Sequence, residues 1–201
     1  MRISVILAHP GSQSFNHAIS QAVSEALTLN GHQVILHDLY AEKFDPVLPF
    51  EEIPKEANLS QEIDLYCREI SLADGIVIIH PNWWGQPPAI LKGWIDRIVR
   101  PGRAYAFMED DQGEGIPIGL WKGKTALVFN TSNTPAEREV RAFGDPLETL
   151  WKNCIFGLCG IENVYREMFS VVVTSTPEQR RAWLRRVQEI IREYFPAEQC
   201  A

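Results

Sequence analysis

The feature that most constrains the fold is a regular alternation between short apolar runs and stretches with helical periodicity. Short apolar runs are typical of strands buried on both faces, and apolar residues three and four apart mark one face of a helix. Strands are predicted at residues 3–8, 33–37, 76–80 and 125–129, with a fifth somewhere within 161–173. Helices are predicted at about residues 15–27, 59–70, 90–99, 147–158 and 177–194.

This alternation also predicts the topology. A helical crossover between strands is right-handed and returns the chain parallel to the strand before it. We therefore expect a single α/β domain over residues 1–201, a doubly wound five-stranded parallel sheet in the flavodoxin-like order 2-1-3-4-5 with helices on both faces. Ligands of such sheets bind beyond the carboxyl ends of the strands, at the switch point between strands 1 and 3. The loops of interest are therefore residues 9–16, 81–88 and 130–135.

Charge and composition exclude several classes of function. Lys and Arg number 19 against 26 Asp and Glu, a net charge of −7 without a basic cluster, which is poorly suited to binding nucleic acid. The longest apolar run has about six residues, where a membrane span needs ~20. The four cysteines form no CxxC motif, so we expect no metal site. The amino terminus resembles no secretory signal, and we expect a cytoplasmic protein without membrane insertion.

The first loop is suited to a phosphate group. His9, Ser12, Ser14 and Asn16 surround the start of a predicted helix, where unpaired N–H groups and the helix dipole favour an anion. The loop has neither the glycines and lysine of a P-loop nor a GxGxxG motif. In the alternative interpretation, the two serines only cap the helix.

The other two loops are suited to a flat ring with polar edges. Trp83 and Trp84 lie between prolines that stiffen the backbone, and a rigid aromatic loop fits a conjugated ring. Alternatively, the two indoles plug the end of the sheet or form a subunit interface. The polar run 130–134 would face the same crevice, although such residues also form ordinary turns. Because no acid, base or nucleophile stands out among the side chains, we expect a cofactor to carry the chemistry.

Three motifs together resemble a known family: His9-Pro10, Ser14-Phe15-Asn16, and the run from Pro81 through Trp84 to Pro88-Ala89-Ile90-Leu91-Lys92-Gly93-Trp94. Nearly the whole chain resembles the flavodoxin-like NAD(P)H:quinone oxidoreductases, the family of DT-diaphorase, the modulators of drug activity and the ancillary flavoproteins of potassium efflux systems. The resemblance implies a homodimer with FMN or FAD bound noncovalently at its interface. Hydride would pass from NAD(P)H to the flavin and then to a small quinone-like acceptor. Use of one site by both substrates predicts ping-pong kinetics.

The resemblance also assigns site residues by position. The cofactor-binding residues would be His9, Ser14, Phe15 and Asn16 for the phosphate and ribityl oxygens, Pro81, Asn82, Trp83, Trp84 and Gly85 along the isoalloxazine ring, and Asn130, Thr131, Ser132 and Asn133 at its polar edge. Tyr105 and Phe107 would line the acceptor pocket of the partner subunit. Ser132 and Asn133 replace two glycines of the family, and Phe143 stands where animal members have a histidine that stabilises the reduced flavin. No catalytic side chain is therefore assigned.

Two other functions fit the same sequence. The first is a flavin-binding regulatory subunit of a transporter, in which reductase activity is incidental. The second is an electron carrier like the flavodoxins, which is disfavoured because 201 residues exceed the size of a minimal carrier.

Overall fold

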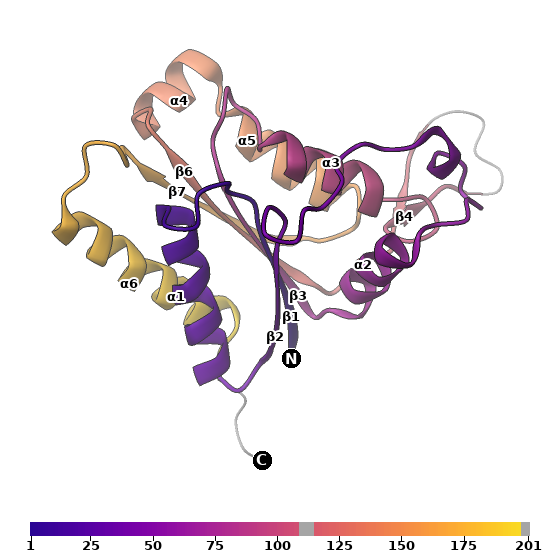
Figure 1. Ribbon diagram of the computed structural model, residues 1–201, viewed down its shortest axis with the longest axis horizontal. Helices are drawn as coiled ribbons and strands as arrows, with labels where there is room; N and C mark the ends of the chain where they lie inside the picture. The colour runs from indigo at the N-terminus through magenta and orange to yellow at the C-terminus, as the bar shows by residue number, and fades with distance from the viewer. Residues whose placement is uncertain (109–114, 198–201) are drawn as a thin grey trace.

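The central feature of the fold is a five-stranded parallel sheet in the order β2-β1-β3-β6-β7 (Figure 1). The computed structural model describes residues 1–108 and 115–197. The strands are β1 (Arg2–Leu7), β2 (Gln33–Asp38), β3 (Gly75–Pro81), β6 (Thr125–Ser132) and β7 (Asn163–Ser170). In chain order this is 2-1-3-4-5, so the predicted fold class is confirmed.

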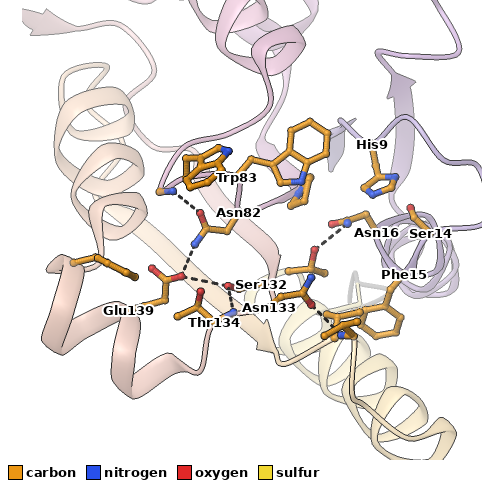
Figure 2. Close-up of a pocket in the computed structure, with 17 residues that line it drawn as sticks. His9, Ser14, Phe15, Asn16, Asn82, Trp83, Ser132, Asn133, Thr134 and Glu139 are labelled. Carbon is orange, nitrogen blue, oxygen red and sulfur yellow. Dashed lines mark hydrogen bonds between the residues drawn. The ribbon is translucent and has the colours of Figure 1, made fainter.

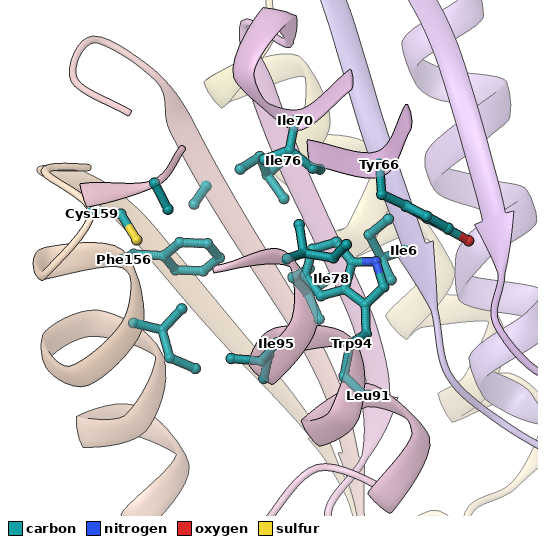
Figure 3. Packing of buried hydrophobic residues seen from close by; sticks show 14 of the residues in the cluster. Ile6, Tyr66, Ile70, Ile76, Ile78, Leu91, Trp94, Ile95, Phe156 and Cys159 are labelled. Atoms are coloured by element: carbon teal, nitrogen blue, oxygen red, sulfur yellow. The ribbon is translucent and has the colours of Figure 1, made fainter. Parts of the chain in front are cut away.

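Helices cover both faces of the sheet, as expected (Figure 1). One face packs against α1 (Phe15–Leu29) and α6 (Pro177–Tyr194). The other packs against α2 (Gln61–Leu72), α3 (Ala89–Ile98) and the π-helical segment η2 (Leu150–Gly157) (Figure 3). Successive side chains of a strand point to opposite faces, so Ile3 and Val5 join the first cluster while Ile6 joins the second. Both cores therefore need the continuous apolar runs seen in the sequence.

Local signals place the ends of the helices. Ser14 caps α1, its Oγ accepting a hydrogen bond from the backbone N–H of His17 at 3.3 Å, and Asn30 ends the helix. Thr176 and Gln179 form a capping box at the start of α6. Because α1 follows β1 after the loop of residues 8–14, its first turn lies at the carboxyl edge of the sheet.

The structure corrects the prediction around the fourth strand of the sheet. The strand β6 continues through Ser132, three residues beyond its predicted end, and Asn130 pairs in register with His80 of β3. A further helix, α4 (Ala136–Phe143), follows it and was not predicted; it has eight residues, and only Glu139 is buried along its length. The helix predicted at 147–158 is instead a short α5 (Pro146–Thr149) that continues into η2.

Two long connections carry short elements of their own. The loop after β2 contains a 3-10 turn, η1 (Phe50–Glu52), and the segment after α3 contains an antiparallel pair, β4 (Tyr105–Ala106) and β5 (Ile118–Gly119).

Of the four cysteines, Cys200 lies outside the described residues. Within residues 1–108 and 115–197, no helix combines the length and the apolar character that crossing a membrane requires.

Candidate functional site

A cavity of about 630 Å³ opens at the carboxyl ends of β1, β3 and β6, beside the start of α1 (Figure 2). This is the position that the switch point of the sheet predicts, since β1 lies between β2 and β3. Every predicted cofactor-binding residue except Asn130 lines it. The lining residues are His9, Ser14, Phe15, Asn16, Pro81, Asn82, Trp83, Trp84, Gly85, Thr131, Ser132, Asn133, Thr134, Glu139, Phe143, Val172 and Val173.

One end of the cavity has the features of an anion site. The first turn of α1 has no acidic residue, and its backbone N–H groups have no acceptor within the helix. The N–H of Gly11 lies 3.0 Å from Nδ1 of His9, and the same Nδ1 lies 3.3 Å from the carbonyl oxygen of Gly11. Burial lowers the pKa of His9, with a further lowering by His17. This end therefore presents backbone N–H donors beside the imidazole ring of His9.

The hydroxyl of Ser14 is already engaged within the protein. Its Oγ lies 2.9 Å from Nδ1 of His17, whose Nε2 lies 3.0 Å from a carboxylate oxygen of Asp38. A carboxylate only accepts, so Nε2 carries the proton and Nδ1 accepts from the hydroxyl when the ring is neutral. Ser14 thus caps the helix, as the alternative interpretation held, and also lines the cavity.

Asn16 presents an unpartnered acceptor to the cavity. The residue is only 2% exposed, and its Nδ2 donates to Oγ1 of Thr131 at 3.0 Å. Its Oδ1 is buried and has no hydrogen-bond partner among the described residues. A buried acceptor without a partner costs free energy, which a ligand hydroxyl or N–H at this point would recover.

The two tryptophans lie in a tight turn at the rim. Trp83 and Gln86 exchange backbone hydrogen bonds of 3.0 Å in both directions, and the residues between them, Trp84 and Gly85, have φ values of 59° and 73°. Positive φ at both central positions defines a type I′ turn, for which Gly85 is well suited. Trp84 is fully exposed, so the interpretation that it plugs the sheet is wrong. A role at a subunit interface stays a prediction.

Three predicted residues lie elsewhere. Asn130 is fully buried beneath the cavity, where its Oδ1 accepts from Nη1 of Arg166 at 2.7 Å. Tyr105 in β4 and Phe107 just after it pack edge to face with ring centroids 5.6 Å apart, outside this cavity. β4 lies on the opposite side of the molecule from α4 in Figure 1. Lining of a partner's pocket by these two aromatic residues therefore stays a prediction.

Sequence reasoning missed three lining residues: Glu139, Val172 and Val173. Glu139 is the notable one, because it is a carboxylate only 4% exposed. The available signal was that Glu139 lies in a segment shortly after the fourth strand. Such a segment starts at the carboxyl edge of the sheet, where the cavity was expected. The valines follow β7, whose carboxyl end was not located in advance.

A family described by its flavodoxin-like fold matches residues 1–193, which is most of the chain. The chain belongs to this family. An uncharacterised NAD(P)H oxidoreductase of Haemophilus influenzae is 34% identical over 185 residues, covering 90% of this chain and 89% of its own. Rat NAD(P)H dehydrogenase [quinone] 1 is 27% identical over 96% of this chain and 78% of its own.

A solved structure of similar sequence agrees with this placement in the flavodoxin-like family. The NAD(P)H:quinone oxidoreductase of Methanothermobacter marburgensis superposes with a TM-score of 0.79 at 26% identity, covering 96% of each chain. The family suspected from the motifs at His9 and around Trp84 is thereby confirmed.

Proposed function

We propose that this protein is a flavin-dependent NAD(P)H oxidoreductase that reduces quinone-like acceptors. The observation that carries the proposal is one cavity with N–H donors for an anion at one end, an aromatic turn at its rim, and the unpartnered Oδ1 of Asn16 between them. A flavin mononucleotide has the same order of groups: phosphate, hydroxylated chain, flat ring. The relatives described above, which are named as NAD(P)H oxidoreductases and quinone reductases, support the proposed activity.

The residues present fit the cofactor group by group. The first turn of α1 and His9 would hold the phosphate, and Oδ1 of Asn16 would accept from a ribityl hydroxyl. The turn at Trp83 and the end of β6 at Ser132 would lie along the ring. When bound, the flavin supplies hydride transfer, which no side chain of this site can perform. The role of the chain is to anchor the tail and to leave one face of the ring open.

The acceptor class and the assembly belong to the same proposal. Donor and acceptor would use one open cavity in turn, which leads to ping-pong kinetics. We infer a homodimer in which Tyr105 and Phe107 complete the acceptor pocket of the partner subunit. In support, large apolar side chains remain exposed at Phe107, at Trp84 and at Phe143, as expected of surfaces that another chain covers. FMN or FAD as cofactor, and a cytoplasmic location, stay predictions.

Steady-state kinetics test the activity. The flavin-loaded protein would be assayed for oxidation of NADH and of NADPH at several concentrations of menadione. We expect double-reciprocal lines that run parallel, because each substrate leaves before the other binds. Intersecting lines would contradict the ping-pong scheme. Negligible NAD(P)H oxidation by protein that retains flavin would favour a flavin-binding regulatory subunit, which co-purification with a membrane partner would then identify.

A further inference from the structure

Glu139 is the only acidic side chain among the described residues that line the cavity. It lies on α4, at the opposite end of the cavity from His9 and Ser14 (Figure 2). A carboxylate that is only 4% exposed is costly unless donors surround it. Its partners therefore indicate why it is there.

Those partners come from two neighbouring strands of the sheet. One carboxylate oxygen of Glu139, Oε1, accepts from Nδ2 of Asn82 at 2.9 Å and from Oγ of Ser132 at 3.3 Å (Figure 2). Asn82 directly follows β3, and Ser132 is the last residue of β6. The side chain of Glu139 thus ties α4 to both strand ends at the cavity.

Asn82 passes this tie on to the tryptophan turn. Its side-chain Oδ1 accepts from the backbone N–H of Gly85 at 2.9 Å. Its backbone N–H donates to the carbonyl oxygen of Thr131 at 2.6 Å. The turn contains Trp84, a non-glycine residue at positive φ, a conformation that persists only where the surroundings enforce it. Fixing the side-chain amide of Asn82 in one orientation supplies that constraint, because its oxygen must face Gly85 while its nitrogen faces Glu139.

We propose that Glu139 is a positioning residue that holds, through the amide of Asn82, the tryptophan turn in the conformation that walls the cofactor site. The inference rests on the proposed function only in that the site takes a flavin. The hydrogen-bonded chain from Glu139 through Asn82 to Gly85 exists in the protein alone, and so can be tested without the cofactor.

A reciprocal exchange of the pair gives the sharpest test. Asn82→Asp places two carboxylates face to face with no donor between them. Adding Glu139→Gln to it restores an amide–carboxylate hydrogen bond with the partners exchanged, and the carboxylate introduced at position 82 can still accept from Gly85. Asn82→Asp alone is expected to weaken FMN binding about tenfold or more, the effect of losing a hydrogen bond to a charged group, and the double variant to recover most of it. Glu137→Gln, on the exposed side of the same helix, is the matched control and should bind like wild type.

Two readouts separate the proposals. FMN affinity is measured by quenching of flavin fluorescence, and the turn itself by fluorine NMR of flavin-free protein labelled with fluorotryptophan. The resonances of Trp83 and Trp84, assigned with phenylalanine variants, should shift or broaden in Asn82→Asp. In the double variant they should return to their wild-type positions and widths. Those of the buried Trp121 and Trp151 should stay in place, showing that the fold is intact.

The positioning role is overturned if the double variant is no better than Asn82→Asp in both readouts, or if the turn resonances do not respond to Asn82→Asp. If the wild-type protein binds no FMN or FAD while the turn resonances follow the exchange, the proposed function fails and the positioning role stands.

Discussion

Replacement of His80 by glutamine should make the stability of the protein less sensitive to acid. His80 is fully buried at the end of β3, just before the cavity. Its Nε2 accepts from Nε1–H of Trp151 at 3.0 Å, and its Nδ1 donates to the carbonyl oxygen of Pro81 at 2.9 Å. The neutral ring satisfies both contacts, whereas a protonated ring would face the indole N–H with a second donor. Burial, with a smaller effect of Arg166, lowers the pKa of His80 to about 4.

The size of the effect follows from this pKa. Unfolded, the imidazole has its ordinary pKa of 6.5, and folded it has a pKa of about 4. A histidine held neutral in the folded state contributes full stability above the unfolded pKa, and this is lost as pH falls from about 6.5 toward about 4. Between about pH 7 and about pH 5, the wild type should therefore lose roughly 2 kcal/mol more unfolding free energy than a variant without this group.

Urea unfolding followed by circular dichroism measures the difference. His80→Gln is the suitable variant, because an amide can accept from Trp151 and donate to Pro81 without titrating. Comparing each protein with itself at the two pH values cancels any constant cost of the substitution. A wild type and a variant that lose stability in parallel would refute the assignment of a neutral, buried His80.

Three further substitutions test other parts of the structure. Glu52→Ala leaves the buried guanidinium of Arg97 without its two-fold hydrogen-bonded partner at 2.7 and 3.0 Å, and should lower the unfolding free energy by about 3–5 kcal/mol in urea titrations. In Gly93→Ala the added Cβ would lie 2.1 Å from the carbonyl oxygen of Pro46. This overpacking should lower the unfolding free energy by about 1–3 kcal/mol, seen as a lower melting temperature in calorimetry. Asn16→Ala removes the acceptor at the cavity and should reduce the flavin retained after dialysis; unchanged cofactor content would contradict its role.

The sheet order was predictable because the three central strands, β1, β3 and β6, are buried on both faces. Such strands produce continuous apolar runs, and the helices between them leave only a parallel arrangement. The helix α4 escaped because its eight residues make only about two turns, and its large apolar residues Val140 and Phe143 stay exposed instead of joining a core. The extension of β6 escaped because Asn130 and Thr131 look like turn residues; backbone pairing with His80 and Pro81 keeps them in the strand.

The cavity could be located in advance for a related reason. The topology fixes which loops meet at the carboxyl edge, so residues as distant as Asn16 and Thr131 were expected together, and they share a hydrogen bond. Contacts made by side chains from an unpredicted helix could not be foreseen. The bond between Asn82 and Glu139 spans 57 positions and depends on where α4 returns, which only the folded chain shows.

The most direct test of the account is the visible absorption spectrum of the purified protein, taken before and after incubation with FMN or FAD, with mass identification of the chromophore released on denaturation. We expect the bands of an oxidised flavin at one flavin per chain, bleaching when NADH or NADPH is added without oxygen. A protein that stays colourless after incubation with either flavin would contradict the central claim that this cavity holds one.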